Sequence, residues 1–498
     1  MPRLRVSDPS RPTPRPRWEP PLFLLCGAAL TLAFPEADLA PLAWVALVPL
    51  LVALRAVRLR RAIAYGTLFG LGFYGTLLVW VSHVGWLGCT VLVIVQSAYL
   101  ALFAGLSSAL ARRAPAILFA VAIPALWVAV DYLRSIFPVG GFTWGQLSQS
   151  QTVIGYLLRP ASVGGAWLLT WLLVAINAQL ALAWARRAPL PHIAIAVILI
   201  AVPLAFPAPN ADGRSIDVAI VQGNVPRDTN LSGTEKLVRI AEDHVAETAE
   251  VSEGIDLVIW PESALGLDID EFPEMRESLA AAAVEVDAPM IVGGEVDEGP
   301  DHRRVVAFEV SADGTITDTY VKTHLVPFGE YVPARSLLDW IPALEQVPRD
   351  ALTGDEPTIF EVAGGPIAPV ISFEGDFGSL ARRRIHEGGR MLVVATNTST
   401  WGDSWASAQH VAFSRLRAVE NGVWVLHAAI SGISAVIAPD GDVVERTPLW
   451  TPTHIEHSVR FASSMTPYAR FGDWVPLLSG LIAISSLGFV YVGSRRRK

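Results

Sequence analysis

The chain has 498 residues, of which 52% are hydrophobic and only 17% are charged, and its mean hydropathy is +0.42. Soluble chains carry about 25% charged residues. The high apolar content here excludes a disordered chain, and the presence of only two Cys excludes a disulfide-stapled scaffold. The net charge of −9 is unevenly distributed, because residues 1–208 hold 15 Arg and five acidic residues, whereas residues 209–494 hold 19 basic and 42 acidic residues. Because the acidic segment 209–494 repels phosphate backbones, nucleic-acid binding is not expected.

The apolar residues concentrate in long runs near the N-terminus and in one run at the C-terminus. A helix that crosses a hydrocarbon core of about 30 Å needs about 20 apolar residues. Runs of roughly this kind occur at 19–35, 39–56, 62–83, 86–111, 115–134, 163–185, 190–207 and 473–493. We therefore expect eight transmembrane helices: seven in a domain of residues 1–207, and one in residues 473–498 together with a basic tail.

The loops between these runs differ in charge. Basic residues gather in every second loop, at 3–17, 55–61, 112–113, 186–187 and 495–498. Loops rich in Lys and Arg stay in the cytoplasm. The sequence therefore predicts a multi-pass membrane protein with both termini in the cytoplasm and residues 208–472 outside it.

Residues 214–460 alternate short β-rich runs with helical patterns. Helices are expected at 233–251 and 272–286. Strands are expected at 215–224, 255–263, 288–296, 304–314, 315–324, 366–375, 389–399, 423–432 and 433–444. Unbroken Val and Ile runs are typical of sheets covered on both faces, so we expect a layered α/β domain. Ligand sites in such folds favour the carboxyl ends of strands, where the polar residues of this segment cluster.

Three of these strand ends hold residues that can carry chemistry. Glu262 follows a buried strand in LVIWPESA, Lys322 and Glu330 lie in YVKTHLVPFGEYVP, and Ser372 and Glu374 lie in VISFEGDFG. Taken singly, each has a simpler explanation as a helix cap, a salt bridge or a solvated side chain. Their occurrence together and in this order is more specific.

With these motifs the chain resembles the apolipoprotein N-acyltransferases, the membrane branch of the nitrilase, or carbon–nitrogen hydrolase, superfamily. The resemblance rests on WPES, on the Lys322 to Glu330 motif, and on a segment from Asn397 through Gln409 and His410 to Gly422. In the membrane part, GFTWGQLSQSQ resembles the GFPW loop of the family. The implied fold is about eight transmembrane helices with an external nitrilase-like αββα sandwich over residues 208–472.

Nitrilase-type enzymes use a Glu–Lys–Cys triad, and the resemblance places Glu262 as the base, Lys322 as the oxyanion stabiliser and position 372 as the nucleophile, with Glu330 and Glu374 as supporting carboxylates. A general base does need a positioned carboxylate, and a developing alkoxide needs a fixed positive donor. The chain departs from the family in having Ser at position 372, and residues 209–472 contain no Cys.

A thiol, with a pKa of about 8.5, ionises more easily than a hydroxyl and is the better nucleophile. Three interpretations of position 372 therefore stay open. Ser372 is a genuine nucleophile activated by Glu262, or the chain is an inactive or engineered trap, or the acyl group moves by direct transfer.

The resemblance also implies a reaction and a place in the cell. An acyl chain passes from a phospholipid to the enzyme, and then to the α-amino group of an S-diacylglyceryl-cysteine lipoprotein, outside the bacterial plasma membrane. Phe373, Trp401 and Trp144 are expected to contact the lipid substrates. No metal or cofactor is expected, because no metal cluster, dinucleotide fingerprint or phosphate-binding loop occurs in the sequence.

Two other functions compete with this one. One is a membrane-tethered amidase, although eight spans exceed what a tether needs. The other is a non-catalytic scaffold, because relatives of this module can be fused or coupled to a polyprenol-phosphate mannose synthase.

Overall fold

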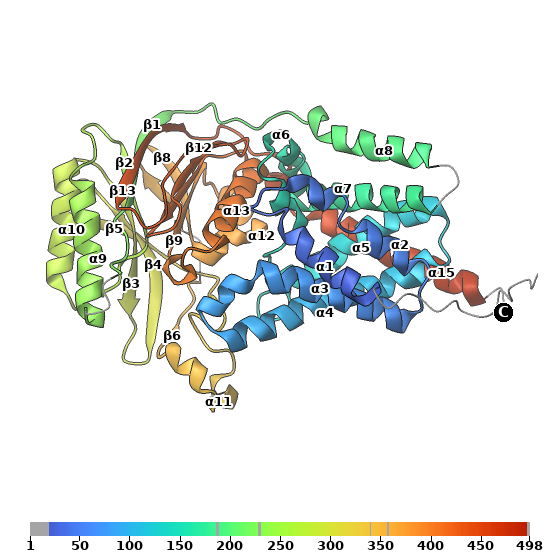
Figure 1. The fold of residues 1–498 in the computed structure, drawn as a ribbon. Helices are drawn as coiled ribbons and strands as arrows, with labels where there is room; N and C mark the ends of the chain where they lie inside the picture. Colours follow the sequence, from blue (N-terminus) through green and yellow to red (C-terminus); the bar gives the residue numbers. More distant parts are fainter. Residues whose placement is uncertain (1–18, 186–188, 228–230, 339, 356–357, 496–498) are drawn as a thin grey trace, which may run out of the picture.

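The structure is a computed structural model that describes residues 19–185, 189–227, 231–338, 340–355 and 358–495. A helical part and an α/β part lie end to end (Figure 1). The helical part consists of α1 (Glu19–Thr31), α2 (Val48–Leu54), α3 (Leu59–Leu77), α4 (Trp86–Ala111), α5 (Ala116–Ile136), α6 (Gly155–Leu158), α7 (Ala161–Trp184), α8 (Leu190–Ala201) and α15 (Trp474–Arg495). Short 3₁₀ turns join them, at η1 (Ala40–Trp44), η2 (Val79–His83), η3 (Leu147–Gln151) and η4 (Val202–Ala205).

Within the described residues, four helices are long and apolar enough to cross a membrane: α4, α5, α7 and α15. The predicted spans near 19–35, 39–56 and 190–207 are shorter apolar helices, and the prediction near 62–83 divides into α3 and η2. Pro35, Pro49 and Pro203 interrupt or begin these segments, since proline lacks the N–H that a continuing helix needs. The count of eight spans stays a prediction, and the basic clusters at 3–17, 186–187 and 496–498 lie outside the described residues.

Glycine allows two helices of this part to approach at backbone distance. A Cβ atom added to Gly27 of α1 would lie 2.0 Å from the carbonyl oxygen of Phe69, and one added to Gly72 of α3 would lie 2.0 Å from that of Leu24. Close packing through small residues is typical of helices in membranes, where apolar burial gives little drive for association.

The α/β part contains two sheets packed face to face. The first has the order β13-β1-β2-β3-β4-β5 with β6 beside β4, and the second has the order β12-β11-β10-β9-β8-β7. Strands β1, β2 and β3 run parallel, as do β8, β9 and β10. The strand bounds are β1 (Ser215–Gln222), β2 (Leu257–Leu265), β3 (Met290–Asp297), β4 (His302–Val310), β5 (Ile316–Val321), β6 (Asp350–Ala351), β7 (Phe360–Val362), β8 (Gly365–Ile371), β9 (Met391–Thr396), β10 (Val425–Ala429), β11 (Ala435–Ile437), β12 (Val443–Arg446) and β13 (Thr453–Arg460).

Helices cover the outer face of each sheet, so the layers are α, β, β and α. One apolar core lies between the sheets and includes Ile259, Ile371 and Leu426. A second core packs α9 (Gly233–Thr248) and α10 (Pro273–Val286) on the first sheet, and a third packs α12 (Gly378–His386) and α13 (Ala406–Asn421) on the second. The predicted αββα arrangement is confirmed. The remaining short helices are α11 (Arg335–Leu338) and α14 (Pro467–Phe471), with 3₁₀ turns η5 (Pro342–Gln346), η6 (Ser372–Asp376) and η7 (Ser399–Trp401).

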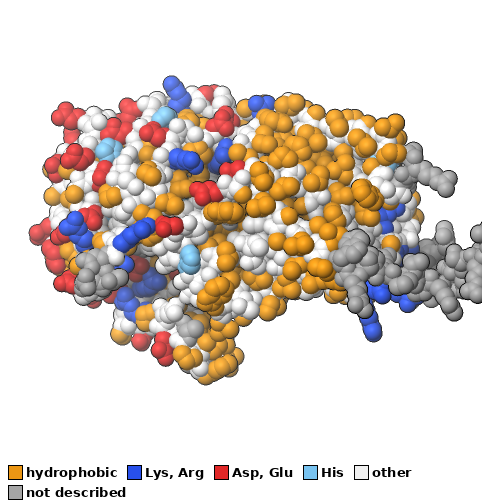
Figure 2. All heavy atoms as spheres, in the orientation of Figure 1, with side chains coloured by type: hydrophobic (Ala, Val, Ile, Leu, Met, Phe, Trp, Pro, Cys, Tyr) orange, Lys and Arg blue, Asp and Glu red, His pale blue; other side chains and the backbone are white. Residues whose placement is uncertain are grey.

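The two parts join where α13 meets α7. Helix α7 is kinked at Gly164 and Gly165, and Gly165 has φ +67°. The kink removes the backbone N–H of Ala166 from the helical ladder, and the carboxylate of Glu420 on α13 accepts its hydrogen bond at 2.7 Å. The surfaces of the two parts differ sharply, because apolar side chains cover the helical part and charged side chains gather on the α/β part (Figure 2). This division fits an integral membrane protein.

Candidate active site

The three strand-end residues predicted from the sequence are all buried in the α/β part. Glu262 lies within β2 near its carboxyl end, Lys322 follows β5 directly, and Ser372 follows β8 directly. Their exposed fractions are 6%, 0% and 7%. A charged or nucleophilic side chain so well buried needs specific partners, because burial without them is costly.

Lys322 bridges two of the predicted carboxylates. Its Nζ donates to Oε1 of Glu262 at 3.0 Å and to Oε1 of Glu330 at 2.5 Å. Burial alone would lower the pKa of Lys322, but the two carboxylates outweigh it and raise that pKa, so the ammonium stays charged. Burial raises the pKa of Glu262, and the nearby charge of Glu330 adds to this, while Lys322 opposes it. A base with a raised pKa is better matched to proton transfer near neutral pH.

Ser372 and Glu262 are connected through adjacent residues at the end of β9. The hydroxyl of Thr396 donates to Oγ of Ser372 at 3.1 Å. The backbone N–H of the next residue, Asn397, donates to Oε2 of Glu262 at 2.8 Å. The structure therefore brings the predicted base and the predicted nucleophile position to one end of the sandwich.

The backbone at Ser372 is strained. Its φ is +49°, in the left-handed region that non-glycine residues rarely adopt. Such a conformation persists only where the surrounding structure enforces it, and it is frequent at active sites. Here β8 ends at Ile371 and turns immediately into η6, so the Ser372 side chain stands at a sharp strand-to-helix turn, the kind of turn that carries the nucleophile in α/β-hydrolases.

Glu374 differs from the other predicted carboxylates, because neutral donors surround it. It is fully buried and accepts the hydroxyl of Tyr320 at 2.7 Å and the hydroxyl of Thr323 at 2.8 Å. It also accepts the backbone N–H groups of Thr323 at 2.9 Å, His324 at 3.0 Å and Ile371 at 2.8 Å. Glu374 therefore ties the segment after Lys322 to the segment before Ser372.

The three predicted aromatic contacts lie at the junction of the two parts. Trp144 is 2% exposed, and its ring lies 5.5 Å from that of Trp401 and 4.7 Å from that of Trp80 in η2. The ring of Phe373 lies 6.3 Å from that of Phe142, which comes from the same loop as Trp144. All three aromatics thus connect the helical part to the neighbourhood of Ser372, while their role in substrate binding stays a prediction.

Sequence reasoning missed several residues that shape this site. Thr396, Asp376 and Tyr320 lie in segments where only their final three-dimensional contacts distinguish them from ordinary polar residues. Gly293 on β3 is a clearer case, because a Cβ atom there would lie 2.3 Å from the carbonyl oxygen of Pro261 and 2.7 Å from Cα of Glu262. The VGGE run at 292–295 therefore allows β3 to pack against the backbone that carries Glu262.

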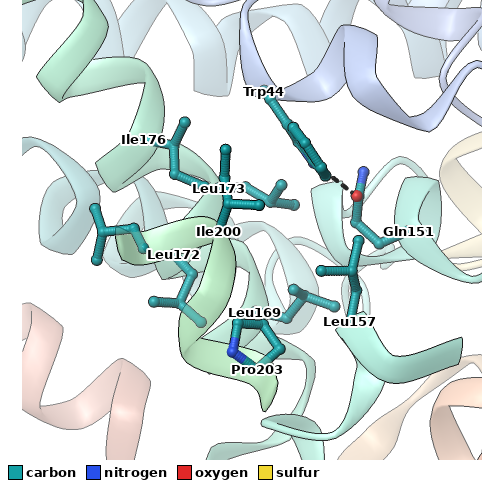
Figure 3. A pocket seen from close by; sticks show the side chains of 10 residues that line it. Trp44, Gln151, Leu157, Leu169, Leu172, Leu173, Ile176, Ile200 and Pro203 are labelled. Atoms are coloured by element: carbon teal, nitrogen blue, oxygen red, sulfur yellow. Dashed lines mark hydrogen bonds between the residues drawn. The ribbon is translucent and has the colours of Figure 1, made fainter. Parts of the chain in front are cut away.

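The structure contains two notable hollows, one at the junction of the two parts and one within the helical part. One has an empty space of about 400 Å³, including space open to solvent, and residues of both parts line it. Its lining mixes apolar side chains with polar ones, and the polar ones include Thr143, Asp376, Arg417, Glu420 and Asp473. The other, in the helical part, is lined by apolar side chains and by Trp44, whose Nε1 donates to Gln151 at 2.8 Å (Figure 3). The second hollow has no titratable side chain in its lining.

Burial raises the pKa of two carboxylates that line the first hollow. The pKa of Glu420 rises to about 6, and that of Asp376 also rises, although His410 opposes the shift at Asp376. No group of three or more His, Cys, Asp and Glu residues that could hold a metal ion occurs in the described ranges.

Comparison with known proteins gives the site its context. Residues 26–179 match the family model for the apolipoprotein N-acyltransferase N-terminal domain, and residues 217–464 match the carbon–nitrogen hydrolase model. An apolipoprotein N-acyltransferase of Geobacter metallireducens is 30% identical over 95% of this chain and 96% of its own. One of Mycolicibacterium smegmatis is 31% identical over 94% and 83%.

The chain belongs to the apolipoprotein N-acyltransferase family. A further member, from Gloeobacter violaceus, is 31% identical over 93% of this chain and 92% of its own. Among solved structures, an amidase from a Nesterenkonia species covers 55% of this chain and 98% of its own, at 17% identity and a TM-score of 0.39. The family name and the carbon–nitrogen hydrolase match support an N-acyltransferase enzyme that acts on lipoproteins.

Proposed function

We propose that this protein transfers an acyl chain from a phospholipid to the N-terminal amine of an S-diacylglyceryl-cysteine lipoprotein through an acyl-enzyme on Ser372. The observation that carries the proposal is the Glu262–Lys322–Glu330 cluster, which lies at the same sandwich end as the strained Ser372 turn. The names of the relatives support the reaction class, and the positions of Glu262, Lys322 and Ser372 are compatible with this chemistry.

In the first half-reaction, Oγ of Ser372 attacks the ester carbonyl of the phospholipid, and its proton passes to the carboxylate of Glu262. The ammonium of Lys322 stabilises the negative charge that develops on the carbonyl oxygen. Collapse breaks the bond to the glycerol oxygen, which takes the proton from Glu262 and leaves as a lysophospholipid. The new bond is an oxyester between Ser372 and the acyl chain.

In the second half-reaction, the α-amino group of the lipoprotein attacks the oxyester of Ser372. Glu262 accepts a proton from the attacking amine and returns one to Oγ of Ser372 as the ester bond breaks. The products are an amide on the lipoprotein and the free hydroxyl of Ser372. Both half-reactions use the same base in alternating protonation states.

We further propose that the helical part crosses the bacterial plasma membrane eight times and holds the α/β part on its outer side. Support comes from the apolar surface of the helical part, which contrasts with the charged surface of the α/β part (Figure 2). It also comes from exposed apolar side chains such as Ile117, Trp184 and Leu481, which are 77%, 79% and 65% exposed. Both lipids of the reaction would then reach the site from the outer leaflet.

The decisive experiment expresses the full chain in a bacterium depleted of its own N-acyltransferase and determines the N-terminus of a lipoprotein by mass spectrometry. We expect triacylated product from the wild type and only diacylated product from Ser372→Ala. Ser414→Ala is a matched control, because Ser414 is also a buried serine of the α/β part, bonded to His427 at 2.8 Å. It should retain triacylation.

Diacylated product alone from the wild type would contradict the acyltransferase, and would favour the scaffold or amidase alternatives. Full triacylation by Ser372→Ala would instead contradict the acyl-enzyme on Ser372. Ser372→Cys restores the thiol typical of the nitrilase triad, and we expect it to retain or raise the rate because a thiolate forms more readily than an alkoxide.

A further inference from the structure

A second set of buried polar side chains, separate from the Glu262–Lys322–Glu330 cluster, is connected to Ser372. Thr396 donates to Oγ of Ser372 at 3.1 Å, and Nδ1 of His410 lies 3.5 Å from the Thr396 hydroxyl oxygen. Nε2 of the same histidine lies 3.2 Å from Oδ1 of Asp376. The exposed fractions of Thr396, His410 and Asp376 are 0%, 1% and 2%. These residues form a continuous polar row from a carboxylate to the proposed nucleophile.

The direction of the contacts determines what the row can do. Since Thr396 donates its proton to Ser372, its oxygen is free to accept from Nδ1 of His410. Nε2 of His410 faces the Asp376 carboxylate, so favourable contacts at both ends need a proton on each ring nitrogen, and the row ends in an ion pair between the His410 imidazolium and Asp376. Ser372 thus receives a hydrogen bond on its oxygen, and its own O–H stays available for a base.

The histidine ring is held firmly between aromatic side chains. The Trp144 ring stacks on His410 with centroids 6.3 Å apart and planes at 12°, and the Trp401 ring meets it edge-on at 5.3 Å. The indole N–H of Trp144 donates to the side chain of Gln409, the residue before His410, at 2.6 Å. A loop of the helical part therefore fixes the ring that contacts Thr396.

We propose that Thr396, His410 and Asp376 are positioning residues that prepare a serine for nucleophilic attack at position 372. This inference rests on the proposed function, because it takes Ser372 as the attacking group. The Thr396 hydroxyl stabilises the charge that develops on Oγ of Ser372 as its proton leaves for Glu262, while His410 and Asp376 hold Thr396 in its donating orientation. Thr396 keeps its own proton throughout, so the row carries no net proton and the balance of both half-reactions is unchanged.

A serine needs this assistance more than a cysteine would. A free thiol has a pKa of about 8.5 and is already partly ionised near neutral pH, whereas a hydroxyl needs an adjacent group to activate it. The contribution of Thr396 should therefore depend on the atom at position 372, and that dependence separates a positioning role from a structural one.

The test is a double-mutant cycle on the full-length protein in detergent with lipid. Thr396→Val removes the hydroxyl at nearly constant shape, and Thr396→Ser keeps it, each in the Ser372 and the Ser372→Cys backgrounds. The rate of acyl-enzyme formation is measured with a phospholipid that carries a fluorescent acyl chain, and thermal unfolding is followed in parallel. Thr248→Val is the matched control, because Thr248 is 2% exposed and bonds Trp260 and His244 far along the chain from Ser372.

With Ser372, we expect Thr396→Val to lower kcat by about 100-fold, the lower end of the range for loss of one charge-stabilising donor, with KM changed by less than about twofold. Thr396→Ser should recover most of the rate, and Thr248→Val should leave it unchanged. With Ser372→Cys, the loss caused by Thr396→Val should shrink to less than about threefold. His410→Gln should behave as Thr396→Val does, and it provides an independent variant should Thr396→Val unfold.

An unchanged kcat in both Thr396→Val and His410→Gln would overturn the inference while the acyltransferase stands. An equal loss of rate in the Ser372 and Ser372→Cys backgrounds would overturn it as well, because it would show a structural effect. If the wild type formed no acyl-enzyme, the proposed function itself would fail, and the inference with it.

Discussion

Two buried carboxylate sites are connected to the Ser372 turn: the pair Glu262 and Glu330, and the single residue Glu374. They differ in the hydrogen-bond donors that they accept. Glu262 and Glu330 share the ammonium of Lys322, so charge faces charge. Glu374 accepts hydroxyl and backbone N–H donors, in a site with no exposed surface. A charged cluster can change its proton content during a reaction, whereas a carboxylate saturated by fixed neutral donors mainly holds the backbone in place. The family resemblance groups Glu330 with Glu374 as supporting carboxylates, but the contacts separate them.

Among the three carboxylates, the largest effect on activity is expected for Glu262→Gln. The amide cannot accept a proton, so kcat/KM for acyl transfer should fall by about 10³-fold, within the range for loss of a general base. The thermal unfolding temperature should also fall by a few degrees, because the amide NH₂ meets a donor on either side, the Lys322 ammonium or the backbone N–H of Asn397. Glu361→Gln, an exposed carboxylate on β7, is the control and should match the wild type. Retained activity in Glu262→Gln would remove Glu262 from the mechanism.

Glu374→Gln should show the opposite balance. The amide NH₂ must face a backbone N–H on whichever side it lies, since Thr323 and His324 donate on one side and Ile371 on the other. Loss of buried bonds to a charged acceptor should lower the free energy of unfolding by about 3 kcal/mol. Activity should fall by only about 10-fold, through displacement of the Ser372 turn. Chemical or thermal denaturation measured beside kcat checks this, and a stable variant with no activity would place Glu374 in the chemistry instead.

The smallest effect is a shift in the pH profile caused by Glu330→Gln. The proposed base must be ionised, so kcat/KM should fall as pH falls through the raised pKa of Glu262, above the ordinary value of 4.5. Removing the negative charge of Glu330 takes away one of the causes that raise this pKa. The acid limb of the profile should therefore move to lower pH in Glu330→Gln, as measured by kcat/KM across the acidic range. An acid limb that stays in place would show that Glu330 acts on Lys322 alone.

Much of the α/β fold could be predicted, because strand patterns are local. The predicted strands appear with their ends moved by a few residues, and the run at 433–444 divides into β11 and β12. Helix α13 was missed, and its burial explains why: apolar, polar and charged residues are buried around nearly its whole circumference, so it lacks the one-sided apolar stripe of a surface helix. Strand β13 was missed because THIEHSVR alternates charged and apolar residues only weakly.

The helical part was harder to predict in detail. Apolar composition indicated spans, but the break at Gly165 depends on a carboxylate about 250 residues away, because Glu420 satisfies the N–H that the kink exposes. Likewise, the need for glycine at positions 27 and 72 could not be predicted, because it arises from the close contact between α1 and α3. Composition reports how apolar a segment is, and it does not report which backbone groups a distant residue will satisfy.

The sequence by itself determined the division into an apolar basic part and an acidic α/β part, the positions of most strands along the chain, and the candidates Glu262, Lys322 and Ser372, because periodicity, charge and motif are properties of neighbouring residues. Only the tertiary structure decided that Glu330 bonds the lysine while Glu374 braces two backbone segments, and that Thr396, His410 and Asp376 reach Ser372. These contacts join residues that the sandwich brings together from distant strands and helices, and their bonding depends on distances and directions that no local pattern contains.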